Sequence, residues 1–182
     1  GDVYKRQVLD GIAAAAEAAG VAIDPQFASN RFIYAYSSSN LGGKLGNRVM
    51  RFKLNDAMTA VSDRTDIVAD IGYKPKATKH PFGGPGAHNG GRIKFSPGDG
   101  FLYVTTGDNH LGSGPQSPTY IGGKVLRIDR DGKAAADNKP PAGFDPRVFG
   151  YIDAVILIVL SQAAAALGLV ALSLIHISEP TR

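Results

Sequence analysis

Three strand-like segments recur in the same order about 70 residues further along the chain, and this repeat constrains the fold more than any other feature. A unit of several strands at this spacing cannot bury both of its faces alone. The repeat therefore predicts consecutive β-sheets stacked as in a β-propeller, and two such units do not close a ring. The repeated pairs are Val21–Pro25 with Ile93–Pro97, Ile33–Tyr36 with Leu102–Thr105, and Val49–Phe52 with Val125–Ile128.

The rest of the pattern between Val21 and Tyr151 is also typical of strands and turns. Arg48–Leu54 alternates basic and apolar residues, as a half-buried strand does. Ser96–Gly100 is a turn signal between Arg92–Phe95 and Phe101–Thr106, and its Asp-Gly chemistry favours a tight antiparallel connection. We therefore predict an all-β fold, a partial β-propeller.

The composition places the chain among globular proteins and excludes several classes. Of 182 residues, 43% are hydrophobic and 20% charged, which suits one ordinary domain. The absence of cysteine excludes disulfides, thiolate metal sites and a cysteine nucleophile. The net charge is +4, but the basic residues are scattered along the chain, so we expect no nucleic-acid partner.

The two ends of the chain do not match its middle. Gly1–Gln7 and Ser173–Arg182 resemble translated sequencing-adapter read-through, and no apolar signal segment follows the first charges. Ala154–Leu174 carries no charge, and could be a membrane helix, a buried helix or an out-of-frame translation. We expect no membrane partner. The expected boundaries are 1–7 for a sequencing artefact, 8–151 for the partial propeller, and 152–182 for a non-native apolar, helical run with an adapter-like tail.

The segment Gly83–Arg92 concentrates glycines around one histidine, His88. Dense glycine lets a backbone turn sharply or approach a flat ligand, and histidine suits proton abstraction near neutral pH. A lone histidine in such a loop also fits a structural role. However, two antiparallel strands joined by the turn at Gly98–Gly100 would return Asp108 to the level of His88. A carboxylate there could orient the imidazole and stabilise its protonated form.

Two alternative sites compete with this pair. His80, His88 and His110 could together bind a metal ion, but their spacing is not diagnostic of one. Asp129–Gly132 resembles part of a calcium loop and lacks the downstream glutamate, so a hairpin turn is predicted instead.

Four motifs stand in a fixed order along the chain, namely Ile23–Phe27, His88–Arg92, Leu102–Asp108 and Gly123–Asp129. Together they resemble the soluble quinoprotein sugar dehydrogenases, the glucose/sorbosone dehydrogenase family. The resemblance implies a six-bladed β-propeller that uses pyrroloquinoline quinone (PQQ) and calcium. It also implies oxidation of an aldose at C1 to the lactone, by an exported protein of the periplasm or the medium.

The resemblance also implies roles for individual residues. His88 would be the base that takes the hydroxyl proton, and Asp108 its orienting partner. Arg92 matches the arginine of the same motif, where a structural role is as good a match as contact with PQQ. The calcium ligands would lie in later blades, beyond this chain. A sugar is the implied substrate, whereas neither the electron acceptor nor the oligomeric state is implied.

Two departures from the family pattern bear on activity. The place of the family's glutamine-bearing segment reads Ala15–Gly20, which has no glutamine. The family's arginine and asparagine that hold the quinone would follow Phe149–Tyr151, where Ile152–Ala154 stands instead. We therefore expect an inactive fragment of an enzyme. The alternative is a non-catalytic propeller that binds carbohydrate or protein, but such a protein needs no base with an orienting acid.

Overall fold

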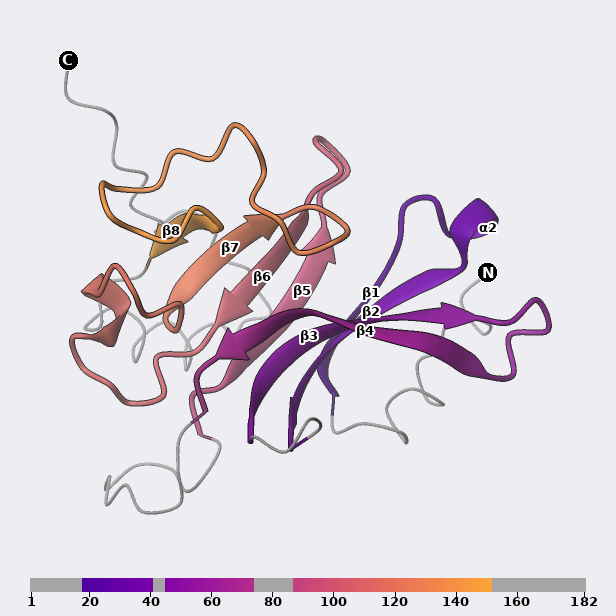
Figure 1. Cartoon of the computed structure of the whole chain (residues 1–182), viewed down its shortest axis with the longest axis horizontal. Helices are drawn as coiled ribbons and strands as arrows, with labels where there is room; N and C mark the ends of the chain where they lie inside the picture. Colours follow the sequence, from indigo (N-terminus) through magenta and orange to yellow (C-terminus); the bar gives the residue numbers. More distant parts are fainter. Residues whose placement is uncertain (1–17, 41–44, 74–86, 152–182) are drawn as a thin grey trace, which may run out of the picture.

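The computed structural model describes residues 18–40, 45–73 and 87–151. They form two four-stranded antiparallel sheets, and in each sheet every strand pairs with the next one along the chain (Figure 1). The first sheet consists of β1 (Ala18–Ile23), β2 (Phe32–Ser39), β3 (Gly46–Leu54) and β4 (Val61–Ile71). The second consists of β5 (Gly90–Phe95), β6 (Leu102–Thr106), β7 (Lys124–Ile128) and β8 (Val148–Tyr151).

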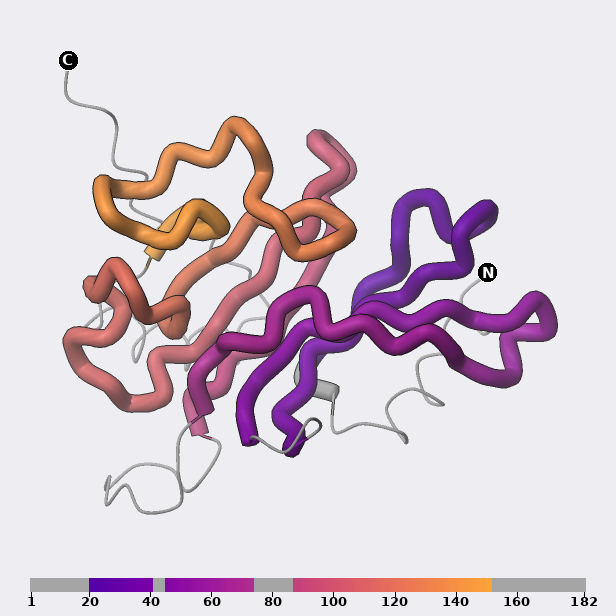
Figure 2. Tube along the Cα trace, in the orientation of Figure 1, coloured from indigo at the N-terminus to yellow at the C-terminus, as the bar shows by residue number. Residues whose placement is uncertain are grey.

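The all-β prediction is confirmed, and the sequence repeat corresponds to equivalent strands of the two sheets. β1 and β5 open the sheets, and the β2–β3 and β6–β7 hairpins follow them in the same order. The helical exceptions among the described residues are one turn of α-helix, α2 (Phe27–Asn30), and a 3-10 turn, η1 (Gly114–Gln116). Figure 2 shows the chain completing the first sheet, in indigo to magenta, before it builds the second, in pink to orange.

Two strands had no separate sequence signal. β4 is largely exposed, and its buried positions are Val68 and Ile71, so it shows little apolar alternation. β8 has four residues, which is too few for a period to be recognised. By contrast, the predicted turn at Asp129–Gly132 is confirmed, because the Gly132 amide donates to the Asp129 carbonyl over 3.2 Å.

The main hydrophobic core lies between the two sheets. The edge of the Tyr34 ring packs against Phe95, with ring centroids 5.0 Å apart and planes at 73°. Burial of these facing side chains is the main force that joins the sheets. The core comprises Tyr34, Tyr36, Val49, Val68 and Ile71 of the first sheet, with Ile93, Phe95, Leu102, Val104, Ile121, Leu126, Ile128 and Val148 of the second part of the chain.

The opening strands of the two sheets approach through glycine. A Cβ atom on Gly20 of β1 would lie 2.1 Å from the carbonyl oxygen of Gly91 of β5. No side chain fits at this distance, so the absence of a Cβ atom permits the backbones to touch.

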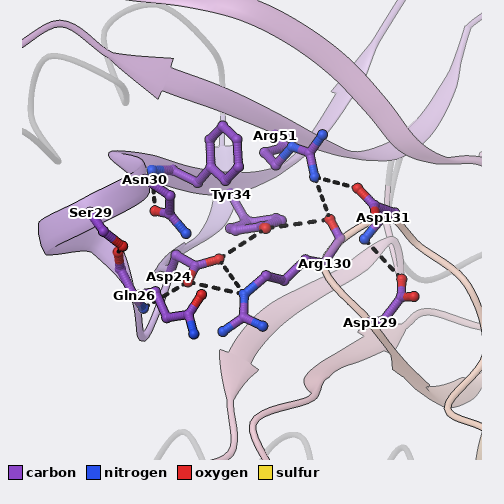
Figure 3. A network of polar contacts seen from close by, with 10 residues as sticks. Asp24, Gln26, Ser29, Asn30, Tyr34, Arg51, Asp129, Arg130 and Asp131 are labelled. Carbon is purple, nitrogen blue, oxygen red and sulfur yellow. Dashed lines mark hydrogen bonds and ion pairs between the residues drawn. The ribbon is translucent and has the colours of Figure 1, made fainter.

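An ion pair also joins the sheets at the end of β1 (Figure 3). The Arg130 Nε donates to both carboxylate oxygens of Asp24, over 2.9 and 3.1 Å, and the Asp24 side chain is completely buried. Burial alone would raise the pKa of Asp24, but the Gln26 amide, the Asn30 side chain and Arg130 outweigh it and hold that pKa below its usual value. The Arg51 guanidinium donates to the Arg130 carbonyl over 3.0 Å.

The terminal segments singled out in the sequence lie outside the described residues. These are 1–7, the apolar run at 154–174 and the tail that follows it. Within residues 18–40, 45–73 and 87–151, no helix has the length and apolarity needed to cross a membrane.

Candidate active site

The β5–β6 hairpin places His88 beside Asp108. His88 lies just before β5 and Asp108 just after β6, and Gly90 pairs with Thr106 in the register between them. As a result, the His88 Nδ1 lies 2.8 Å from the Asp108 Oδ1. The His88 side chain is 31% exposed and that of Asp108 8% exposed, so solutes can reach the imidazole while the carboxylate is shielded.

This geometry suits a general base. A carboxylate accepts hydrogen bonds, so the proton shared with Asp108 belongs to Nδ1, and the lone pair of Nε2 can accept another. The His110 amide donates to the same Asp108 oxygen over 3.1 Å and fixes the carboxylate from its own backbone. The pair can therefore take up a proton and stabilise the imidazolium that results.

The backbone on both sides of the pair adopts the left-handed region. The φ angles are 58° at His88, 53° at Asn109 and 58° at His110, an unfavourable conformation for residues with a Cβ atom. Gly107 closes the same turn, because a Cβ atom there would lie 1.6 Å from the His88 carbonyl oxygen.

The loop that follows β6 is anchored by the half-buried Tyr120 and the buried Lys124. The Tyr120 hydroxyl donates to the Asn109 Oδ1. Burial, with the negative charge of Asp108, raises the pKa of Tyr120 to about 12, which keeps this donor protonated at neutral pH. The Lys124 ammonium donates to the Pro115 carbonyl, and burial lowers the pKa of Lys124 to about 8.

The sequence also singled out Arg92, His110 and His80 as candidate site residues. Arg92 is on β5 with its residue exposed, and its backbone amide donates to the Thr105 hydroxyl over 3.2 Å. The His110 ring contacts the His88 ring, with centroids 3.6 Å apart. His80 lies outside the described residues. In the part of the chain that the structure describes, no three His, Asp or Glu side chains are grouped to hold a metal ion.

Sequence reasoning missed Asn89, Asn109 and Tyr120, which surround the pair. The available signal was position, since Asn89 and Asn109 directly follow His88 and Asp108. Asparagine tolerates the left-handed region better than most residues, so Asn109 in a turn was a candidate for it. Tyr120 had no local signal, because the loop after β6 brings it back to the site.

Comparison with known proteins shows that the similarity to sugar dehydrogenases extends over most of the chain. A sequence model of the family described as Glucose / Sorbosone dehydrogenase matches residues 9–151. The aldose sugar dehydrogenase YliI of Escherichia coli (strain K12) is 30% identical over 119 residues, which cover 65% of this chain and 29% of that protein.

Solved structures show the same relationship. An oxidoreductase (glucose dehydrogenase) from Thermus thermophilus is 35% identical, with a TM-score of 0.58 over 73% of this chain and 38% of its own. The PQQ-bound aldose sugar dehydrogenase of Streptomyces coelicolor is 30% identical, with a TM-score of 0.58 over 72% of this chain and 35% of its own. The chain thus spans about a third of the length of each of these relatives. Its two sheets are part of a β-propeller, and the chain belongs to the glucose/sorbosone dehydrogenase family.

Proposed function

We propose that this chain contributes two blades and the proton-accepting pair of a larger, six-bladed, PQQ-dependent aldose dehydrogenase. The observation that carries the proposal is the hydrogen bond of 2.8 Å between the His88 Nδ1 and the Asp108 Oδ1. The sugar substrate is proposed by analogy with relatives that are described as aldose sugar dehydrogenases. A propeller that only binds carbohydrate has no use for a base held in one orientation by an acid.

In this proposal, the pair removes a proton from the sugar. The hydroxyl at C1 gives its proton to the His88 Nε2, the C1–H bond breaks with loss of a hydride, and the C1–O bond becomes the carbonyl of the lactone. Asp108 retains the hydrogen bond from Nδ1 and stabilises the positive charge of the imidazolium. When bound, PQQ would supply the acceptor of the hydride.

The described residues fit part of a PQQ site. Arg92 presents an exposed cation on the strand that begins next to His88, suited to a carboxylate of PQQ. The glutamine, arginine and asparagine of the family pattern are absent from 15–20 and 152–154. We therefore propose that the isolated chain is inactive, and that calcium ligands belong to later blades.

The same proposal places the protein in the periplasm or the medium, as the family resemblance implies. It leaves the electron acceptor open. Fractionation of cells that express the complete protein tests the location, and a cytoplasmic protein would contradict it.

The test of function is an assay of the complete protein that carries these blades, beside the isolated chain. Both are supplied with PQQ, calcium, an aldose and an artificial electron acceptor, and binding of PQQ and of sugar is titrated separately. We expect sugar-dependent reduction of the acceptor by the complete protein and none by the isolated chain. Sugar binding without oxidation would instead support a non-catalytic propeller, and activity of the isolated chain would contradict the proposed incompleteness.

A further inference from the structure

Asn109 makes three hydrogen bonds to the neighbouring residues His88 and Asn89. Its backbone amide donates to the His88 carbonyl over 3.1 Å, and its Nδ2 donates to the same oxygen over 3.2 Å. The Nδ2 also donates to the Asn89 Oδ1 over 2.8 Å, and the Asn109 Oδ1 accepts from the Tyr120 hydroxyl. Asn109 is buried, and its side-chain hydrogen bonds to His88, Asn89 and Tyr120 are partly shielded from water.

These hydrogen bonds stabilise a backbone segment that adopts an unfavourable conformation. The left-handed φ angles at His88 and Asn109 are less favourable than right-handed ones for residues with a Cβ atom. Two donors on the His88 carbonyl offset that cost and prevent the peptide from turning away. Since the imidazole is attached to the same residue, the direction of its ring toward Asp108 depends on this peptide.

The hydrogen bonds continue into the first sheet through Asn89. The Asn47 Nδ2, from β3, donates to the Asn89 Oδ1 over 3.0 Å, beside the bond from Asn109. The Asn89 Nδ2 donates to the Ser38 Oγ over 3.1 Å, and the Tyr36 hydroxyl donates to the Asn89 carbonyl over 2.6 Å. The residue after His88 is therefore held from both blades at once.

We propose that Asn109 is a positioning residue, which together with Asn89 and Asn47 fixes the His88 imidazole against Asp108. This inference rests on the proposed function of His88 as the base. Asn109 acts through the His88 peptide and not on the sugar. Its loss therefore lowers the rate of proton transfer while the affinity for sugar and PQQ is retained.

The test compares Asn109→Asp with a matched control, Asn138→Asp, in the complete protein. Asn109→Asp keeps the shape of the side chain but turns the Nδ2 donor into an acceptor that faces two oxygens. The control residue Asn138 has a similar pattern, since its Nδ2 donates to the carbonyls of Arg127 and Pro146 over 2.9 and 3.0 Å and its Oδ1 accepts from the Arg127 guanidinium over 3.1 Å. A third variant, Tyr120→Phe, removes only the hydrogen bond from the Tyr120 hydroxyl to the Asn109 Oδ1.

Two readouts are measured in each variant, beside the melting temperature. One is the downfield proton NMR signal of the His88 Nδ1–H, assigned by its loss in Asp108→Asn, which needs no activity. The other is kcat and KM for the sugar. For Asn109→Asp we expect loss of the NMR signal and a fall in kcat of about tenfold to a hundredfold, with KM and PQQ affinity within about threefold. Tyr120→Phe should shift both readouts in the same direction, by less.

The control separates positioning from general stability. Asn138→Asp should keep the NMR signal and kcat, whatever its effect on the melting temperature. The proposal is overturned if Asn109→Asp retains the signal and kcat, or if both variants lose activity only in proportion to unfolding. If the complete protein does not oxidise sugars, the proposed function fails, and the NMR signal alone still decides whether Asn109 holds His88 against Asp108.

Discussion

The His88 Nδ1 and the Asp108 Oδ1 are 2.8 Å apart, because one hairpin returns the end of β6 to the start of β5. The carboxylate lies deeper than the imidazole, with 8% of its side chain exposed against 31%. A shielded carboxylate behind an accessible imidazole suits the proton abstraction proposed for His88.

In the complete protein, His88→Ala should lower sugar turnover by about a hundredfold to ten-thousandfold, because a positioned general base is lost. Asp108→Asn should cost less, since the imidazole remains but loses orientation and charge stabilisation. Steady-state kinetics with saturating PQQ and calcium measure both effects, and cofactor titration serves as the control. Wild-type turnover in His88→Ala would make His88 structural, whereas loss of PQQ binding alone would make it a cofactor ligand.

The buried ion pair between the sheets should contribute to stability. Asp24→Asn removes the charge that pairs with Arg130, and we expect a loss of about 1–2 kcal/mol in the free energy of unfolding. The matched control is Asp70→Asn, which breaks a pair with Arg147 whose aspartate is 57% exposed and should cost less than about 0.5 kcal/mol. Denaturant unfolding measures both, and equal losses would show that burial of Asp24 is irrelevant.

The contribution of Asp24 should also depend on pH. Its pKa in the folded protein lies below the ordinary value of 3.8, so folding favours the ionised form. The stabilisation is complete above about pH 3.8 and is lost as the pH falls through the lower, folded pKa. The stability difference between wild type and Asp24→Asn should therefore be constant from neutral pH down to that point and shrink below it. If this stability difference instead grew on acidification, the pKa of Asp24 would not be lowered by folding.

Contact between the opening strands should not tolerate a side chain. Gly20→Ala places a Cβ atom 2.1 Å from the Gly91 carbonyl oxygen, so the two sheets must separate locally. We expect a loss of about 1–3 kcal/mol, as for other overpacked sites. Gly98→Ala is the control, because its Cβ atom would meet the Ser96 Oγ at an ordinary 3.7 Å. Thermal unfolding that ranks the two variants equally would refute the backbone contact.

Gly107 should be required for the turn that holds His88 beside Asp108. In Gly107→Ala the Cβ atom would overlap the His88 carbonyl oxygen at 1.6 Å, and the His88 peptide must move. We expect kcat to fall at least about tenfold, since displacement of a catalytic group by an ångström has effects of this size or larger. Gly112→Ala, in the same loop with nothing within 4 Å of its Cβ atom, should retain activity. Similar kcat values in the two variants would show that turnover does not depend on the position of the His88 peptide.

Local sequence patterns were sufficient to predict many of the strands and turns. The alternation in Arg48–Leu54 and the turn at Ser96–Gly100 indicated antiparallel strands, because strand periodicity and turn chemistry involve residues close together in the chain. The hairpin also explains why Asp108 could be assigned to the level of His88. β4 was not predicted, since an exposed edge strand forms by hydrogen bonding to β3 and has little apolar signal of its own.

The sequence by itself therefore determined the strands that repeat in the two sheets and the proximity of His88 and Asp108 across one turn. The tertiary structure alone decided what surrounds them. Asn47 reaches Asn89 from another blade, and Arg130 reaches Asp24 across 106 residues. Such contacts depend on how two sheets pack face to face, and burial in that interface makes ordinary asparagines and aspartates specific partners. No local pattern records that packing, because it arises only when both sheets have formed.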